Sequence, residues 1–401
     1  MNSFFTTLFN NSSKVAESEK SVLRAIVGCE SISVGEIAEK CNLSIPTASK
    51  FIDELVESGI IIDLGQRHKQ GGRKPNMYAP NPAIGYFVGV DLRNHTAQIG
   101  VMDFGGNLIF KSDRFAFGLE RSNAFNHICT AIDTELKNSG IDPQDIIAYT
   151  FSVPGRVNTN TGESFNYFTE VKGSLREAFK ERLGAEVYID NDSRVMCYGE
   201  YVHSKLADFS NMLYINLSWG LGMGMILDGK LYYGHTGFSG ELGHIPIFDN
   251  EIFCRCGKKG CLETEASGNA MLRILQIKHA AGAQSVLSPK IERNEKITTQ
   301  DFIDAVDSGD MLMIEILEEV GTSLGKGIAA MINVLNPQLV VLGGALAQTE
   351  DYLLMSTLSS VRKHSINIVN RETTFRLAAT GNDVDILGCC YIARDKTLQI
   401  L

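Results

Sequence analysis

The sequence lacks any apolar run long enough to cross a membrane, and it has no low-complexity tract or short internal repeat. A membrane-spanning helix needs about 20 predominantly apolar residues, so a transmembrane protein is not expected. The first residues, MNSFFTTLFNNSSK, have no signal-peptide pattern, so a secreted protein is not expected either.

Charge is distributed unevenly along the 401 residues. The chain holds 37 Lys and Arg against 47 Asp and Glu, a net charge of −10, and it is 44% hydrophobic. Residues 1–80 hold nine charges of each sign, so the negative excess lies in residues 81–401. The length and composition are ordinary for a globular protein of two or three domains. A neutral head with a basic run, followed by an acidic body, is compatible with nucleic-acid binding by the head alone.

One stretch, Gly240–Glu263, gathers side chains that bind metals. Cys254, Cys256 and Cys261 have the spacing C-x-C-x4-C, and His244 lies ten residues before the first of them. Three thiolates and one imidazole fill the tetrahedron of Zn²⁺ and leave no position for water, so we expect a structural zinc site. The alternative is three unrelated buried cysteines. Zinc-binding thiolates also favour a reducing compartment, the cytoplasm.

Two carboxylates flank the expected metal site. Glu241 lies three residues before His244, and Glu263 lies two residues after Cys261. A metal that fixes both segments also fixes both carboxylates, and carboxylates accept hydrogen bonds well from sugar hydroxyls. We therefore predict a sugar site here. The alternative is that each glutamate is a solvated surface charge.

The motif GELGH, followed by CRCGKKGCLE, resembles the signature of the ROK family, which joins bacterial sugar kinases and sugar-responsive repressors. The likeness covers essentially the whole chain. It implies an α/β body of the actin-like ATPase superfamily, with two lobes and a sugar in the cleft between them. It also implies that Asn166, Asn191 and Asp192 bind the sugar, and that His244 contacts the sugar as well as the zinc. A merely structural role for Asn166 in a turn is the alternative.

The periodicity of apolar residues agrees with an α/β body of two lobes. Strands are expected within residues 85–111, 146–157, 186–189, 212–231, 339–342 and 375–378, and helices within 122–140, 264–282, 311–335 and 387–401. A more polar insertion, residues 287–310, is expected to form two short helices.

The first 60 residues read as three helices. Ser33 and Glu36 have capping-box spacing, and Ser44 is a candidate N-cap for a third helix that ends at Gly59. Two helices joined by a short turn are typical of a helix-turn-helix, whose second helix reads base edges with its first turns. The residues placed there are Thr47, Ser49 and Lys50. The alternative is a protein-interaction module.

A basic hairpin is predicted after these helices. Residues 66–78, QRHKQGGRKPNMY, contain four positive charges and no acidic residue: Arg67, Lys69, Arg73 and Lys74. A wing of this kind suits phosphate contacts or insertion into a minor groove. The segment GGRKP also resembles the wing of ROK repressors. The sequence therefore predicts a winged helix-turn-helix DNA-binding domain.

Two turns resemble the phosphate loops of the superfamily, but side chains replace glycines in both. Family kinases have Gly-Gly-Thr after the position of Asp91, whereas this chain has Leu92–His95. They have Gly-Thr-Gly where this chain has Ser218–Gly220. Arg93 and Trp219 therefore stand where ATP needs bare backbone and space. Gly343 and Gly344, farther along, match the loop that holds adenosine in the kinases.

The leading hypothesis is a cytoplasmic, sugar-responsive repressor that binds operator DNA as a homodimer or homotetramer. The expected parts are a winged head (1–82), a first lobe (83–200 with 385–401) and a second lobe (201–384). The alternative is an ATP-Mg-dependent sugar kinase with an appended head, in which Asp192 would be the catalytic base for the attacking sugar hydroxyl. Asp91 and Asp192 support this alternative, and Arg93, Asn94 and Trp219 oppose it.

Overall fold

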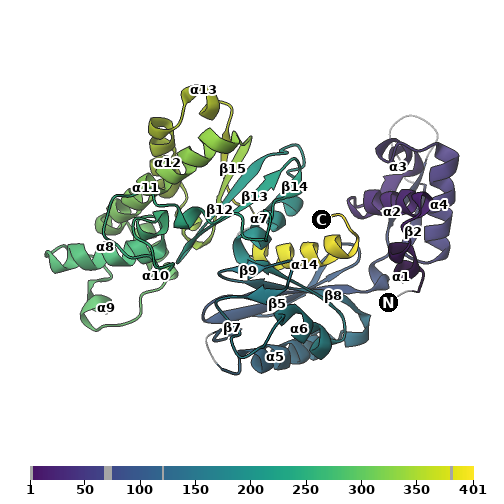
Figure 1. Cartoon of the computed structure of the whole chain (residues 1–401), viewed down its shortest axis with the longest axis horizontal. Coiled ribbons are helices and arrows are strands. Elements are labelled where there is room, and N and C mark those ends of the chain that lie inside the picture. Colours follow the sequence, from purple (N-terminus) through teal and green to yellow (C-terminus); the bar gives the residue numbers. More distant parts are fainter. Residues whose placement is uncertain (1–2, 67–74, 120–121, 380–382) are drawn as a thin grey trace. The chain divides into compact units, whose positions relative to one another are not determined.

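The structure is a computed structural model that describes residues 3–66, 75–119, 122–379 and 383–401. The chain forms two compact units, Met1–Asn191 with Ile386–Leu401, and Asp192–Asp385. Figure 1 colours the chain from purple at the N-terminus to yellow at the C-terminus.

The head of the first unit begins with four helices: α1 (Ser3–Asn10), α2 (Lys14–Val27), α3 (Val34–Lys40) and α4 (Ile45–Glu57). The predicted capping box is confirmed, because the Ser33 hydroxyl accepts the Glu36 amide while the Glu36 carboxylate accepts the Ser33 amide. Ser44 caps α4 by accepting the amide of Thr47 at 3.3 Å, as predicted. Side-chain caps thus fix where the second and third predicted helices begin.

A small sheet completes the head. Its strands have the order β1-β3-β2, with β1 (Ile32–Ser33), β2 (Ile61–Gln66) and β3 (Asn76–Pro80). β2 and β3 run antiparallel, with Ile61 opposite Pro80 and Gln66 opposite Asn76. The predicted hairpin is therefore present. Its basic turn, including Arg67, Lys69, Arg73 and Lys74, lies outside the described residues.

The rest of the first unit is built on a mixed sheet with the order β11-β8-β4-β5-β6, in which β7 also pairs with β5. Its strands are β4 (Tyr86–Leu92), β5 (Thr96–Asp103), β6 (Leu108–Lys111), β7 (Phe115–Ala116), β8 (Ile146–Val153) and β11 (Glu186–Asn191). Its helices are α5 (Ala124–Ser139), α6 (Leu175–Leu183) and most of α14 (Val384–Thr397). β4, β8 and β11 run parallel, so their carboxyl ends meet at one edge of the sheet.

The second unit has its own sheet, with the order β14-β13-β12-β15-β16. Its strands are β12 (Met212–Leu217), β13 (Leu221–Leu227), β14 (Lys230–Leu231), β15 (Leu339–Gly343) and β16 (Thr374–Leu377). Its helices are α7 (Asp192–His203), α8 (Gly268–Ala280), α9 (Ser288–Glu292), α10 (Thr299–Asp307), α11 (Met311–Leu335), α12 (Asp351–His364) and α13 (Asn367–Asn370). Leu213 and Ile215 of β12 share an apolar core with Leu324 and Ile328 of α11.

Short elements occupy several loops. They are the strands β9 (Val157–Asn158) and β10 (Glu163–Ser164) and the 3₁₀ turns η1 (Pro82–Ile84), η2 (Pro143–Asp145), η3 (Leu242–His244), η4 (Leu262–Thr264) and η5 (Ala345–Thr349). The long helix expected over residues 311–335 is present, and it ends at Asn336, whose φ of 45° is left-handed. The two short helices expected in residues 287–310 are α9 and α10.

Helices α6, α7 and α12 were not predicted from the sequence. The middle of α12 contains Ser356, Thr357, Ser359 and Ser360, which are weak helix formers. Tertiary packing explains why it is helical, because Ser360 donates its hydroxyl to the carbonyl oxygen of Thr322 in α11 at 2.6 Å. Intrinsic propensity is a weak guide where two helices pack this closely.

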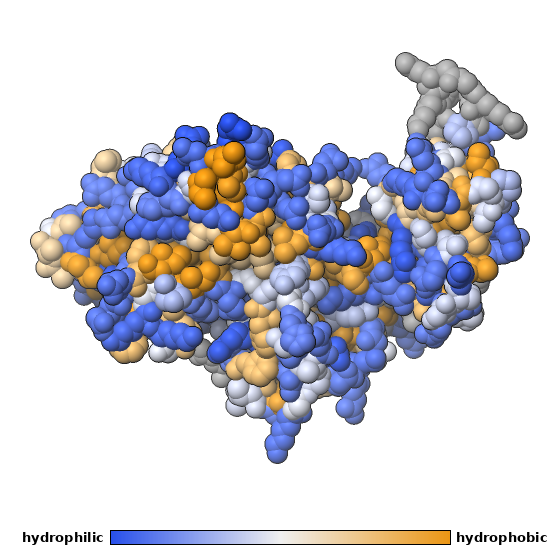
Figure 2. Space-filling view, turned by 45° about the horizontal axis from the view of Figure 1, so that its top comes forward, coloured by the Kyte–Doolittle hydropathy of each residue, from blue (hydrophilic) through white to orange (hydrophobic). Residues whose placement is uncertain are grey.

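The visible surface in Figure 2 is mostly hydrophilic, with apolar residues in separate patches. Within the described residues, no helix joins the length and the apolar character that crossing a bilayer demands.

Replacing Gly325 by alanine should lower the melting temperature. A Cβ atom at Gly325 would lie 2.5 Å from the Cβ of Ser360 and 2.6 Å from the carbonyl oxygen of Thr357, both in α12. Overpacking typically costs about 1–3 kcal/mol, which outweighs the ~1 kcal/mol of helix propensity gained. Thr322→Ala, on the exposed side of α11, is the control and should change little. Equal melting temperatures for Gly325→Ala and the parent would show that α12 moves aside without cost.

Candidate metal and sugar site

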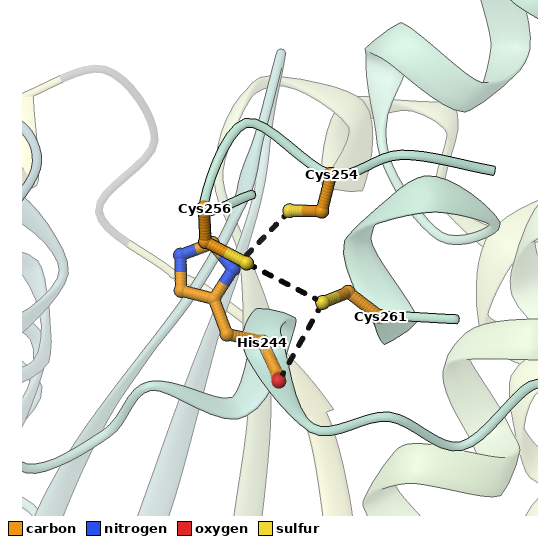
Figure 3. A group of neighbouring side chains, drawn as sticks. All are labelled: His244, Cys254, Cys256 and Cys261. Carbon is orange, nitrogen blue, oxygen red and sulfur yellow. Dashed lines mark hydrogen bonds between the residues drawn. The ribbon is translucent and has the colours of Figure 1, made fainter. Parts of the chain in front are cut away.

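The four predicted metal ligands come together in the second unit. His244 ends η3, and Cys254, Cys256 and Cys261 lie in the loop that leads to η4. Their ligand atoms all lie within 4.8 Å of one another. The Cys254 sulfur is 3.5 Å from His244 Nδ1, and the sulfurs of Cys256 and Cys261 are 3.6 Å apart (Figure 3). Three sulfurs and one imidazole nitrogen at these separations fit tetrahedral Zn²⁺.

Backbone turns bring the cysteines together. Cys254 donates its amide to the carbonyl of Lys258 at 2.8 Å, which closes the first turn. Gly260 has a φ of +73°, and a Cβ there would lie 2.1 Å from the carbonyl oxygen of Phe248. The Phe248 amide in turn donates to the Gly260 carbonyl at 3.1 Å. Only glycine suits this position, and the turn it makes delivers Cys261 to the other ligands.

The thiols differ in their proton affinity. Burial raises the pKa of Cys254 to about 12 and is the main cause that raises the pKa of Cys261. Partial burial acts in the same direction at Cys256, but hydrogen bonds from the Lys258 amide and the neighbouring thiols outweigh it, and the pKa of Cys256 is lowered. A metal ion that binds here must displace protons from the two buried thiols. This requirement favours a strong Lewis acid such as Zn²⁺.

Glu241 lies beside the metal ligands, as predicted. Its carboxylate oxygen Oε2 is 3.6 Å from His244 Nε2, while the other ring nitrogen, Nδ1, faces the cysteines. The preceding residue, Gly240, has a φ of +89°, and a Cβ there would lie 2.2 Å from the carbonyl oxygen of Met223 in β13. The glycine therefore holds Glu241 against the sheet. A carboxylate in this place orients the imidazole of a metal-bound histidine.

Glu263 serves a different segment. Its Oε2 accepts the amide of Leu221, the first residue of β13, at 3.1 Å. Glu263 thereby fixes the turn Ser218–Gly220, which connects β12 to β13. One end of the metal loop thus orients histidine through Glu241, and the other end braces the sheet through Glu263.

The two predicted asparagines lie in the first unit and converge on one turn. Asn166 Oδ1 accepts the amide of Arg156 at 2.9 Å, and Asn191 Nδ2 donates to the carbonyl of Gly155 at 2.9 Å. Both amide groups therefore brace the turn that follows β8. Asp192 is the first residue of α7, and its Oδ1 accepts the backbone amide of Ser193 at 2.8 Å.

The loop after β4 carries an ion pair in place of a phosphate cradle. The Asp91 side chain is 2% exposed, and its Oδ2 lies 3.1 Å from Arg93 Nε and 2.8 Å from a terminal nitrogen of Arg114. Asn94 Oδ1 accepts the hydroxyl of Tyr167 at 2.7 Å. The residues that replace the glycines thus bond within the protein. A carboxylate between two guanidinium groups is already neutralised.

The second loop is also engaged internally. Trp219 is partly buried and stacks on Phe302 of α10, with ring centres 6.1 Å apart and planes 3° apart. The Ser218 hydroxyl accepts the amide of Ala345, just after Gly344, at 3.0 Å. The turn Ser218–Gly220 and the loop after β15, which begins with Gly343 and Gly344, are therefore tied together within the second unit.

The predicted DNA-reading residues occupy the first two turns of α4. The Thr47 hydroxyl lies 2.7 Å from the Ser44 hydroxyl, so Thr47 takes part in the cap. Ser49 is partly exposed, and the Lys50 side chain is 67% exposed and lies 3.7 Å from Glu54. Lys50 and Ser49 remain available to a partner.

Sequence reasoning missed Arg114 and Asn216. Arg114 pairs with Asp91 from the segment between β6 and β7, and Asn216 of β12 bonds Ser193 and Ser218. Neither residue belongs to a spaced motif. Only the pairing of strands brings these side chains to their partners, so no local signal could have indicated them.

Two protein families match this chain in different regions. The winged helix-turn-helix DNA-binding family matches residues 16–62, which places the head in that class. The ROK family matches residues 87–396. The chain belongs to the ROK family.

Its relatives include repressors and kinases. The xylose repressor of Bacillus subtilis (strain 168) is 26% identical over 384 residues, which cover 96% of each chain. The transcriptional regulator NagC of Escherichia coli (strain K12) is 28% identical over 344 residues, 84% of this chain and 82% of NagC. A glucokinase of Halalkalibacterium halodurans is 27% identical over 320 residues, 78% of this chain and 96% of the glucokinase.

Solved structures confirm the fold predicted from the sequence, a winged helix-turn-helix followed by a ROK body. A ROK family transcriptional regulator, described as a homologue of the E. coli MLC protein, superposes with a TM-score of 0.79 at 24% identity and covers 95% of each chain. A ROK glucokinase from Streptomyces griseus, solved with glucose and AMPPNP, has a TM-score of 0.68 at 24% identity, over 78% of this chain and all of that one.

Replacing Cys256 by serine should remove bound zinc. One of four ligands is lost, and serine is a poor zinc ligand at neutral pH. We expect about one zinc per chain in the parent by atomic emission spectrometry and close to none in Cys256→Ser. Cys41→Ser, a partly exposed cysteine of the head, is the control and should keep its zinc. Full zinc content in Cys256→Ser would rule out the four-ligand site.

Proposed function

We propose that this protein is a sugar-responsive transcriptional repressor of carbohydrate genes. The observation that carries the proposal is that one polypeptide joins a DNA-binding head to a ROK body. In this body the loop after β4 is closed by the ion pair of Asp91 with two arginines. The head matches a DNA-binding family at residues 16–62. Relatives named as repressors match over almost the full length, head included.

The ion pair of Asp91 supports sensing rather than phosphoryl transfer. A kinase needs its acidic residue available to the metal ion of ATP-Mg, and it needs backbone amides around the phosphates. Here Arg93 and Arg114 neutralise Asp91, and Trp219 fills part of the second loop. Breaking such a pair to admit ATP-Mg would leave charges poorly solvated in a buried place.

The sugar is assigned to six side chains, and five of them offer carboxylate or amide groups for hydroxyls. They are Asn166, Asn191, Asp192, Glu241, His244 and Glu263. Zinc would have a structural role, because it fixes His244 and the loop between the two glutamates. Zinc binding and sugar binding should therefore be linked.

The partners proposed are operator DNA and a small sugar or sugar derivative. Winged heads that read paired half-sites work in dimers, so we propose a homodimer or homotetramer. DNA contacts are assigned to Thr47, Ser49 and Lys50 of α4 and to the four basic residues of the wing. DNA binding and a thiolate metal site both favour the cytoplasm. We propose three functional parts: a winged head (1–82), a first lobe (83–200 with 385–401) and a second lobe (201–384).

A sugar kinase with an appended head is the second candidate. Asp192, the expected catalytic base, is present, and glucokinases are among the relatives. The neutralised Asp91 is the observation against it.

A thermal-unfolding screen separates the two functions. D-xylose, D-glucose, N-acetylglucosamine and their phosphates are tested with and without ATP-Mg. A ligand that binds the folded state raises the melting temperature, so we expect one sugar to raise it by several degrees and ATP-Mg to add nothing. Asp192→Ala is the control variant and should lose the response to the sugar. No response to any sugar would contradict the sensing function.

A coupled kinase assay with the same sugars addresses the enzyme directly. We expect no sugar-dependent ADP release, because Arg93 and Arg114 are paired with Asp91, the carboxylate that would bind the metal ion of ATP-Mg. Turnover above about 1 per second would establish the kinase instead.

Removing wing charges should weaken the salt dependence of DNA binding. Each phosphate contact contributes a slope of about −0.9 to log K against log salt, so Lys69→Ala with Arg73→Ala should reduce the slope by about two. Fluorescence anisotropy with a labelled duplex at several salt concentrations measures this slope. Lys137→Ala with Lys230→Ala, two exposed lysines of the body, is the charge-matched control. An unchanged slope in the wing variant would exclude phosphate contacts by these residues.

A further inference from the structure

Four hydrogen bonds connect Asp192 with the loop after β15, all within the second unit. The Ala345 amide donates to Ser218 Oγ at 3.0 Å, and the Ser218 hydroxyl donates to Asn216 Oδ1 at 3.0 Å. Asn216 Nδ2 donates to Ser193 Oγ at 3.1 Å, and the Ser193 hydroxyl donates to Asp192 Oδ1 at 3.3 Å. The five residues come from η5, the β12–β13 turn, β12 and the start of α7.

The donors in this series of four hydrogen bonds all point the same way. Each hydroxyl accepts one bond and donates the next, and the Asn216 side chain accepts through its oxygen and donates through its nitrogen. The series ends on a carboxylate, the strongest acceptor among the groups involved. Hydrogen bonds arranged head to tail polarise one another, so each bond is strengthened by the next. An arrangement with one donor reversed would not have this property.

The middle of this hydrogen-bond series is shielded from water. Ser193 is 3% exposed and Asn216 is 7% exposed. Gly222, on the neighbouring strand β13, leaves the space for the Ser193 hydroxyl, because a Cβ at Gly222 would lie 2.0 Å from Ser193 Oγ. A polar series at this depth retains its bonds, because water cannot replace a lost partner at low cost.

We propose that Ser193, Asn216 and Ser218 are positioning residues for Asp192. They form a relay that fixes Asp192 Oδ1 and thereby the orientation of the carboxylate toward the sugar hydroxyl. This inference rests on the proposed sugar site. The relay also links the Asp192 carboxylate to the loop that begins η5. A sugar that bonds to Asp192 therefore changes the strength of the hydrogen bond that the Ala345 amide donates. The two ends of one lobe respond together to the sugar.

The first test needs no sugar. Hydrogen exchange of the backbone around Ala345 is followed by mass spectrometry in the parent, in Ser193→Ala and in Ser210→Ala. Ser210 also bonds within the second unit, to Gln338, but lies outside the relay. We expect exchange at Ala345 to rise about threefold in Ser193→Ala and to stay unchanged in Ser210→Ala. Unchanged exchange in Ser193→Ala overturns the relay.

The second test measures sugar affinity by titration calorimetry for Ser193→Ala, Ser218→Ala and the double variant. The ligand is D-xylose, D-glucose or N-acetylglucosamine, whichever stabilises the parent. The Ser193 hydroxyl bonds the charged Asp192 carboxylate, and a bond of this kind is worth roughly a factor of ten. Ser218→Ala breaks the same relay farther along, so we expect each single variant to bind about tenfold more weakly. Because both substitutions break one relay, the double variant should bind no more weakly than the weaker single variant. Zinc content and melting temperature serve as folding controls.

The outcomes are distinct. Independent losses that multiply to about a hundredfold in the double variant overturn the relay, and so does unchanged affinity in a folded Ser218→Ala. If the parent binds none of the three sugars, the proposed sugar site fails, and the exchange experiment alone decides whether the relay exists.

Discussion

The cluster of His244, Cys254, Cys256 and Cys261 is the constraint on which the site depends. Between β14 and α8 the chain forms two short 3₁₀ turns and two isolated bridges, and its backbone bonds are those of local turns rather than of a continuous helix or sheet. Side chains that meet at one point replace the missing secondary structure. The two glutamates at the ends of this loop acquire fixed positions for the same reason, one beside the histidine and one on the amide of β13.

A second feature of the ROK body is that the charged and polar side chains of its loops are paired within the protein. Asp91 is held by two guanidinium groups, and Ser218 and Asn94 make bonds inside the protein. The same α/β scaffold that positions phosphates in kinases is here bonded to itself. At both loop positions of this chain, the side chains that replace glycines bond or stack within the protein.

Local chemistry explains how far the sequence could be read. Caps at Ser33 and Ser44 and the bounds of the helix 311–335 are set by neighbours in the chain, and these predictions are confirmed. The cysteine spacing likewise predicted which four side chains come together, although the zinc itself stays a prediction. Helix α12 was missed because its stability comes from packing on α11. Arg114 and Asn216 were missed because strand pairing, not spacing, brings them to their partners. The roles of the six sugar residues stay predictions, since the amides of Asn166 and Asn191 also brace a turn.

The pairing of Asp91 with two arginines makes its neutralisation resistant to single substitutions. Removing Arg93 alone would leave Asp91 paired with Arg114, and removing Arg114 alone would leave Arg93. Each single replacement would leave a buried carboxylate with an incomplete set of partners, at a cost in stability. The carboxylate nevertheless stays paired until both arginines are lost. The neutralisation of this loop is therefore redundant, and one substitution at either arginine does not restore a free acidic group.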